Sequence, residues 1–192
     1  VPHGPFLFGE KKDKTSLDYD FEIGAFPVTC REYKRFVDST GHDVPFVEKD
    51  WAKSYNWNEK TKEFQEGKGD HPVVLVSHKD AEAYCSWLSG QAENDGFEIR
   101  LPTEEEWEKA ARGQDGWEYP WGDEFDPERC NTAESEKGGT TEVTQYPGGQ
   151  SPYRCGDMAG NVWEWTSTKT GPAFVLKGGS WPDDRGLARC AA

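Results

Sequence analysis

One short segment concentrates the residues best suited to hold a metal ion. It reads DMAGNVWEWT from Asp157 to Thr166, with two carboxylates seven positions apart and a glycine between them. A glycine lets the backbone turn so that carbonyl groups point inward, and oxygen ligands of this kind suit a hard cation such as Ca²⁺. Spacing alone leaves a second interpretation open, in which Asp157 caps a turn and Glu164 forms an ion pair.

Soft-metal and nucleophilic chemistry find little support in the residue pattern. The five cysteines are odd in number and none has the CxxC spacing of a zinc site, so free thiols are expected. The four histidines, His3, His42, His71 and His78, are scattered, and the last two are better explained as structural residues. No Ser-His-Asp order, phosphate-binding glycine loop or paired-carboxylate cleft stands out.

Three segments begin with the signature of a helix N-terminus. Each places a hydroxyl residue at the N-cap and a carboxylate three positions later, which satisfies two backbone N–H groups. The three N-caps are Thr29, Ser77 and Thr103. Apolar residues recur at helical spacing after each of them, and the helices are expected to end near Gly41, Gly90 and Gly113.

Strand signals are fewer and shorter than the helix signals. The four candidates are residues 5–8, 21–23, 71–76 and 173–177. From Gly113 to Gly171 the chain is rich in Gly, Pro, Trp and polar residues and shows little periodicity. A long irregular segment of this kind usually carries function or is held in place by something, such as a bound ion.

Composition excludes several classes of protein. The chain has 192 residues, the length of one domain, and its 22 basic and 36 acidic residues give a net charge of −14. This charge disfavours a nucleic-acid partner, and no apolar run is long enough to span a membrane. Nine Trp, ten Phe and seven Tyr predict a loop-rich fold with an aromatic core. Unpaired thiols and the absence of a signal peptide lead us to expect a cytoplasmic location.

The sequence resembles the formylglycine-generating enzyme, or sulfatase-modifying factor, family. The resemblance includes residues 156–166 and extends, in the family's order, over nearly the whole chain. The other matching strings are FPVT at 26–29, HPV at 71–73, RLPTEEEWE at 100–108, YPWG at 119–122 and KGGSW at 177–181. It implies one α+β domain over residues 1–192, with an elaborated C-type-lectin-like fold, two to three helices and a small twisted antiparallel sheet. The family's C-terminal strand is expected to be missing, and the domain could be a module of a larger protein.

The resemblance also implies structural calcium. In the family, one Ca²⁺ is held by side chains that match Asp157 and Glu164 and by carbonyl groups that match Gly160 and Val162. All four positions are intact in this sequence. This ligand set agrees with the oxygen chemistry expected from the residues themselves.

A second calcium site of the family begins at the position of Asn131, with the carbonyl group of Thr132. Its remaining ligands fall within residues 133–139, where this chain is shorter. Glu134 and Ser135 are the candidates there.

The copper chemistry of the family's catalytic members is not expected here. Those members carry two cysteines, separated by four residues, after a Gly-Gly-Ser-aromatic string, and the thiolates bind Cu(I) and activate O₂. Counting forward from Trp181 places Asp183 and Ala188 at these positions, and neither side chain can hold Cu(I). The nearby Cys190 is expected to be a buried structural residue. The iron site of members that form C–S bonds is not visible either.

Two functional hypotheses follow. The first is a non-catalytic recognition module, like the modules that many bacterial members of the family resemble, that binds a protein or other ligand. Its proposed contact residues are Ser180, Trp181, Pro182, Asp183, Asp184 and Arg185. Exposed aromatic and arginine side chains are typical interface anchors, but an ordinary surface loop explains the segment equally well. The second hypothesis is a divergent metal-dependent oxidoreductase of the same family, which uses another metal or a residue beyond Ala192.

Overall fold

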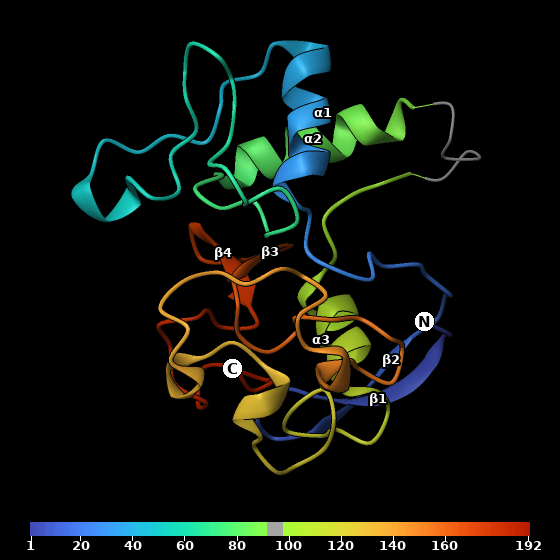
Figure 1. Ribbon diagram of the computed structural model, residues 1–192. Coiled ribbons are helices and arrows are strands. Elements are labelled where there is room, and N and C mark those ends of the chain that lie inside the picture. The colour runs from blue at the N-terminus through green and yellow to red at the C-terminus, as the bar shows by residue number, and fades with distance from the viewer. Residues whose placement is uncertain (92–97) are drawn as a thin grey trace. The chain divides into compact units, whose positions relative to one another are not determined.

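Each predicted helix begins at a hydroxyl side chain that accepts a hydrogen bond from the backbone. The helices that the computed structural model describes are α1 (Cys30–Thr40), α2 (His78–Ser89) and α3 (Glu104–Arg112) (Figure 1). At α1, the Thr29 hydroxyl accepts from the Glu32 N–H at 3.2 Å, and the Glu32 carboxylate accepts from the Thr29 N–H at 2.8 Å. Ser77 and Thr103 start α2 and α3 in the same way. The three predicted helices are therefore confirmed, because their caps are local interactions that the sequence alone specifies.

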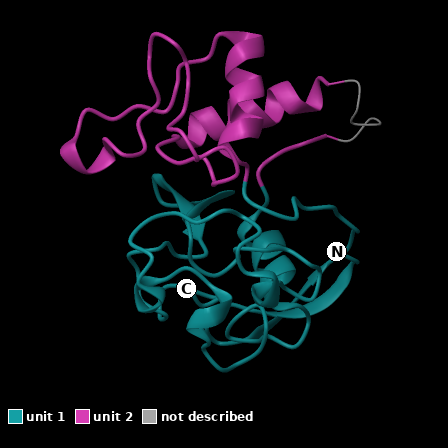
Figure 2. Cartoon of the chain, viewed as in Figure 1, with its two compact units in different colours: residues 1–27, 102–192 teal, residues 28–101 magenta. Residues whose placement is uncertain are grey.

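Residues 1–91 and 98–192 are described, and they fall into two compact units (Figure 2). Unit 1 contains residues 1–27 and 102–192, and unit 2 contains residues 28–101. Short 3₁₀ helices interrupt the loops. They are η1 (Asp50–Ala52), η3 (Pro127–Arg129), η4 (Ala133–Ser135) and η5 (Pro147–Gly149). The low periodicity of residues 113–171 is thus confirmed up to the start of a strand at Glu164.

The strands form two antiparallel hairpins in unit 1. The first pairs β1 (Gly4–Phe8) with β2 (Asp13–Leu17), and the second pairs β3 (Glu164–Thr170) with β4 (Ala173–Lys177). The predictions of strands at 5–8 and 173–177 are confirmed, and the helices and hairpins together give the expected α+β fold. Neither β2 nor β3 was predicted, because both are dominated by polar residues and lack alternating apolar ones.

Two other strand predictions are wrong. Residues 21–23 form no strand, although the N–H of Phe21 donates to the Val1 carbonyl at 3.1 Å. Residues 71–76 contribute only an isolated bridge between Thr29 and Pro72, and Leu75 adopts a left-handed φ of 62° that ends any extended run. The apolar side chains of this segment pack on a helical core instead of joining a ladder.

The core of unit 1 is built on α3. Trp107, Ala110 and Ala111 on its buried face pack with Cys155 and Cys190. The helix also carries a buried ionic cluster. Oε1 of Glu108 pairs with Arg112 at 2.8 Å, and its Oε2 lies 3.5 Å from Nζ of Lys177. All three charged side chains are about 1% exposed, and the single carboxylate of Glu108 faces both cations, while Lys177 also lies 4.0 Å from Glu104.

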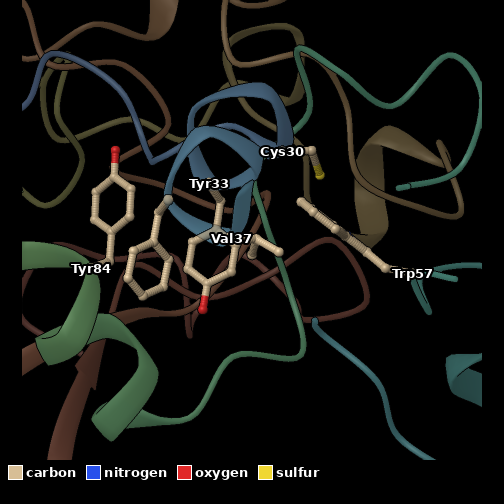
Figure 3. Close-up of a cluster of buried hydrophobic side chains, with 6 residues drawn as sticks. Cys30, Tyr33, Val37, Trp57 and Tyr84 are labelled. Carbon is tan, nitrogen blue, oxygen red and sulfur yellow. The ribbon is translucent and has the colours of Figure 1, made fainter. Parts of the chain in front are cut away.

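Unit 2 has an aromatic core between α1 and α2 (Figure 3). Tyr33 of α1 stacks on Tyr84 of α2 with ring centroids 5.7 Å apart, and it meets Trp57 edge-on at 6.0 Å. Cys30, Phe36 and Val37 complete the buried cluster. The aromatic content of the sequence therefore serves packing here, as the composition predicts.

None of the helices within residues 1–91 and 98–192 combines the length and the apolar character that crossing a bilayer would require.

Candidate functional site

The segment between the two predicted calcium ligands has an unusual backbone. Asp157, Gly160 and Asn161 all adopt left-handed conformations, with φ of 60°, 80° and 62°. Two main-chain hydrogen bonds of 2.7 Å hold the turn, from the Gly160 N–H to the Gly178 carbonyl and from the Asn161 N–H to the Asn131 carbonyl. A Cβ at position 160 would press directly against the Asn131 carbonyl, so the turn requires glycine.

The buried side chain of Asn161 connects this turn to its surroundings. Its Nδ2 donates to Oδ2 of Asp157 at 2.8 Å and to the Thr141 carbonyl at 3.2 Å. Its Oδ1 accepts from the Thr141 N–H at 3.0 Å and from Nδ2 of Asn131 at 3.2 Å. The strained left-handed backbone is therefore held by a fully connected polar network.

Asp157 and Glu164 form a pair of buried acidic groups. Burial raises the pKa of Asp157 to about 7, although the hydrogen bond from Asn161 acts in the opposite direction. Burial also raises the pKa of Glu164 to about 8, and the charge of Asp157 adds to the increase, whereas the hydrogen bond from Trp107 lowers it. Two carboxyl groups that lack a nearby cation resist ionisation in this way.

The Glu164 carboxyl group is only half satisfied. Its Oε2 accepts from the indole Nε1 of Trp107 at 3.0 Å, and its buried Oε1 has no hydrogen-bond partner among residues 1–91 and 98–192. Within the described parts of the chain Glu164 makes no ion pair, so the alternative interpretation of Glu164 as an ion-pair residue has no support among these residues. A buried acceptor left in this state is costly unless something else binds it.

The donors at this site fit a hard divalent cation. Both side chains offer carboxylate oxygens, and the carbonyls of Gly160 and Val162 belong to the same turn. The Val162 carbonyl faces Gly178, where a Cβ would lie 3.8 Å from its oxygen. Among the described residues, no group of three or more His, Cys, Asp or Glu side chains is arranged to hold a metal. A cation here would thus depend on carbonyl oxygens as well as on the two carboxylates, as Ca²⁺ commonly does.

The residues predicted for the second calcium site lie together in a tight turn. The Ser135 hydroxyl lies 3.2 Å from Oδ1 of Asn131 and 2.7 Å from the Thr132 carbonyl. The resemblance assigns the position of Asn131 and the carbonyl of Thr132 to calcium. Oε1 of Glu134 accepts from the N–H of Arg185 at 3.0 Å, and an interaction with the Thr132 side chain contributes to lowering the pKa of the Glu134 carboxyl group. Both candidates therefore lie beside Thr132, and Ser135 also contacts Asn131.

The predicted recognition segment, residues 180–185, forms a closed turn. Oδ2 of Asp183 accepts from both the N–H and the hydroxyl of Ser180, and the Asp183 N–H donates to the Ser180 carbonyl at 3.0 Å. Ser180 is buried and Trp181 is partly buried, whereas Pro182, Asp184 and Arg185 are exposed. The Trp181 N–H donates to the Asn161 carbonyl at 3.2 Å, so this turn is attached to the segment that carries the carboxylate pair.

The structure provides no thiol at the two positions of the family's copper ligands. The carboxylate of Asp183 accepts a hydrogen bond from the N–H of Ser180, and Ala188 is fully buried. Cys190 is buried as predicted, and burial raises the pKa of its thiol far above the ordinary value. A thiol of this kind is held in the unreactive protonated form.

Three long-range contacts of these sites escaped the sequence analysis. Within the described residues, the indole of Trp107 is the only hydrogen-bond donor to the Glu164 carboxyl group, and Glu134 and Tyr119 hold the backbone of Arg185 through hydrogen bonds of 3.0 and 3.1 Å. The helical periodicity of residues 104–112 identifies Trp107 as a core residue, but no spacing rule links it to a carboxylate 57 positions away.

Comparisons with known proteins agree on one family. The family model of the sulfatase-modifying factor enzyme 1-like domain matches residues 1–192. The chain is 35% identical over 236 residues to the inactive C-alpha-formylglycine-generating enzyme 2 of Mus musculus, covering 95% of this chain and 73% of the relative. It is 30% identical to the hercynine oxygenase of Mycolicibacterium smegmatis, covering 98% of this chain and 55% of that protein.

A solved structure supports the fold. PvdO from Pseudomonas aeruginosa superposes with a TM-score of 0.74 at 20% sequence identity, over 100% of this chain and 84% of PvdO. At this identity the likeness concerns the fold alone. The family model and the identity to the mouse relative show that the chain belongs to the sulfatase-modifying factor enzyme 1-like family, with the formylglycine-generating-enzyme type of α+β fold.

Proposed function

We propose that this chain is a non-catalytic recognition module of its family, stabilised by calcium, that binds a protein or other ligand through residues 180–185. One observation carries the proposal. The segment that resembles the copper-binding segment of catalytic members contains Asp183 bonded to Ser180 and a buried Ala188, and neither position has a thiol. The similarity to a mouse relative described as inactive points in the same direction.

The carboxylate pair supports the calcium part of the proposal. Asp157 and Glu164 would bind Ca²⁺ with the carbonyls of Gly160 and Val162, and the ion would supply the positive charge that the pair lacks. Oε1 of Glu164 is buried and has no partner in the described part of the chain, so it is available as a ligand. Asn131 and Thr132 are proposed as ligands of a second calcium ion, with Ser135 beside them.

The recognition part rests on how the exposed residues are presented. Pro182, Asp184 and Arg185 project from a turn whose backbone is fixed by residues outside it. An exposed surface that is already ordered loses little conformational entropy on binding. The partner is proposed to be a protein or a small molecule. A nucleic acid is disfavoured by the net charge of −14.

The cellular compartment is proposed to be the cytoplasm. All five cysteines are free thiols, and four of them are buried. Thiols that remain unpaired in a chain of this size are typical of reducing compartments.

A divergent oxidoreductase is the second candidate, favoured by the 30% identity to a hercynine oxygenase. Metal analysis by mass spectrometry separates the two proposals. The purified protein is then incubated with Cu(I) and a cysteine-containing sulfatase-motif peptide, and the peptide mass is followed. Calcium without copper, and an unchanged peptide, are expected. Retained copper or the mass loss of aldehyde formation would contradict the non-catalytic proposal.

The recognition surface is tested by partner capture with two matched variants. The first replaces Pro182, Asp184 and Arg185 with alanine, and the second replaces the exposed Pro172, Asp115 and Arg154 of the same unit. Only the first is expected to lose partners that the unsubstituted chain retains. Equal retention by both variants would contradict the assignment of the surface.

A further inference from the structure

Arg185 combines a fixed backbone with an exposed side chain. Its N–H donates to Oε1 of Glu134 at 3.0 Å, and its carbonyl accepts from the Tyr119 hydroxyl at 3.1 Å. The two side chains that hold it come from positions 51 and 66 residues away. Both peptide groups of a single surface residue are thus fixed by separate parts of unit 1.

The residues beside Arg185 are fixed as well. The carbonyl of Asp183 accepts from the N–H of Ala133 in η4 at 2.9 Å. Oδ1 of Asp184 accepts from the Gly186 N–H at 2.8 Å, which closes a small turn. The nearby carboxylates therefore satisfy backbone N–H groups of this loop, and they make no ion pair with Arg185.

The guanidinium group of Arg185 makes no hydrogen bond or ion pair with the described part of the chain. Three other arginines of unit 1 form ion pairs. Arg112 pairs with Glu108 at 2.8 Å, Arg129 with Asp126 at 3.0 Å, and Arg189 with Glu10 at 2.7 Å. The exposed Arg154 forms none within the described residues, and its N–H makes a local hydrogen bond, to the Ser151 carbonyl at 2.9 Å. In a protein with 36 acidic residues, an exposed arginine that is held at its backbone and left unpaired at its side chain is positioned for an external ligand.

We propose that Arg185 anchors the ligand of the recognition surface by binding a single carboxylate, supplied by an acidic side chain or a chain terminus of the partner. This inference rests on the proposed function. A planar guanidinium matches a carboxylate through two parallel N–H···O bonds. Ligands of higher negative charge are disfavoured because Asp183, Asp184 and Glu134 lie in the same loop region.

Glu134 is the positioning residue in this arrangement, and its two possible effects have opposite signs. Its charge alone would repel an anionic ligand, so removing the charge would strengthen binding. Its hydrogen bond fixes Arg185, so removing the acceptor would weaken binding. Glu134→Gln removes the charge and keeps an acceptor oxygen, whereas Glu134→Ala removes both. The proposal predicts weaker binding by Glu134→Ala than by Glu134→Gln.

The test uses a displayed library of random peptides, selected on the calcium-loaded protein and counter-selected on the alanine variant of Pro182, Asp184 and Arg185. Selected peptides are synthesised with acidic residues or with their amide counterparts, and with free or amidated C-termini. Their affinities are measured for the unsubstituted protein, Arg185→Gln and Arg154→Gln. Arg154 is an exposed arginine of the same unit and serves as the matched control. Thermal melts verify that each variant is folded.

The expected result is a loss of about tenfold in affinity for either Arg185→Gln or the acid-to-amide peptide, with little further loss when both changes are combined. The peptide series shows whether a side chain or the terminus supplies the carboxylate. Two results would overturn this inference and leave the proposed function intact. One is that the two losses of affinity add up, and the other is that peptides whose binding depends on residues 180–185 bind Arg185→Gln as tightly as the unsubstituted protein. If no selected peptide depended on the loop, both would be overturned.

Discussion

Removal of calcium is expected to make the stability of this protein fall as pH rises, an effect that the calcium-bound protein should not show. The prediction follows from the two acidic groups at the first proposed calcium site. In the calcium-free fold, burial raises the pKa of Glu164 from 4.5 to about 8 and that of Asp157 from 3.8 to about 7. The folded protein therefore holds protons that the unfolded chain has already released.

The sign and size of the effect follow from this difference. Between about pH 5 and 6.5, both carboxyl groups are mostly protonated in the fold and mostly ionised in the unfolded chain. Each group then lowers the free energy of unfolding by about 1.4 kcal/mol for every unit of increase in pH. For a chain of this size, that corresponds to a decrease in the melting temperature of about 3–6 °C per pH unit and per group. Ca²⁺ bound at the proposed site would stabilise the ionised carboxylates, so its contribution to stability is expected to grow over the same range.

Thermal melts from pH 5 to 8, with excess chelator or with excess calcium, measure the effect. Glu164→Gln is the matched variant, because glutamine keeps the size of the side chain and does not titrate. Without calcium, the melting temperature of this variant should fall less steeply with pH than that of the unsubstituted chain. The difference between the two slopes should equal the contribution of one carboxyl group. Identical slopes for the two proteins would refute the reasoning, and so would a melting temperature at pH 8 that is the same with chelator and with calcium.

Two further substitutions test individual contacts of the site. Trp107→Phe removes the only hydrogen-bond donor to the Glu164 carboxyl group among the described residues and is expected to cost about 1–3 kcal/mol of unfolding free energy in urea titrations. Trp51→Phe, at a side chain that is 68% exposed, should change this free energy by less than about 0.5 kcal/mol. Equal effects would argue against the indole–carboxylate contact. Gly160→Ala should destabilise the protein by more than Gly171→Ala, because both glycines have a positive φ but only Gly160 lies against a neighbouring carbonyl. A smaller loss at position 160 would show that the turn can move away.

The sequence predicts those parts of the structure that depend on local interactions. The capping boxes at Thr29, Ser77 and Thr103 join residues three positions apart, and all three helices begin where expected. The strand prediction at residues 71–76 failed because the left-handed Leu75 lies inside an apolar run, and no local signal marks that conformation. The polar strand β2 is stabilised by its pairing with β1, which a pattern search does not detect.

The same distinction applies to the candidate sites. Asp157 and Glu164 stand out because they lie in one short segment with Gly160. Trp107 and Glu134 act on residues 57 and 51 positions away, so their roles become visible only in three dimensions. The burial that raises the pKa of both carboxyl groups is likewise a property of the folded unit.

The division of the chain into units has a consequence for the order of folding during synthesis. Unit 2 is one continuous stretch, residues 28–101, whereas unit 1 needs segments from both sides of it. The first hairpin is held by Lys109, which donates to the carbonyls of Pro2 and Gly4, and by Glu108, which accepts from Gly9, across separations of 99 to 107 positions. These contacts cannot form until the ribosome has released α3. Until then the first hairpin lacks its native contacts with Lys109 and Glu108, whereas the aromatic core of unit 2 can already assemble.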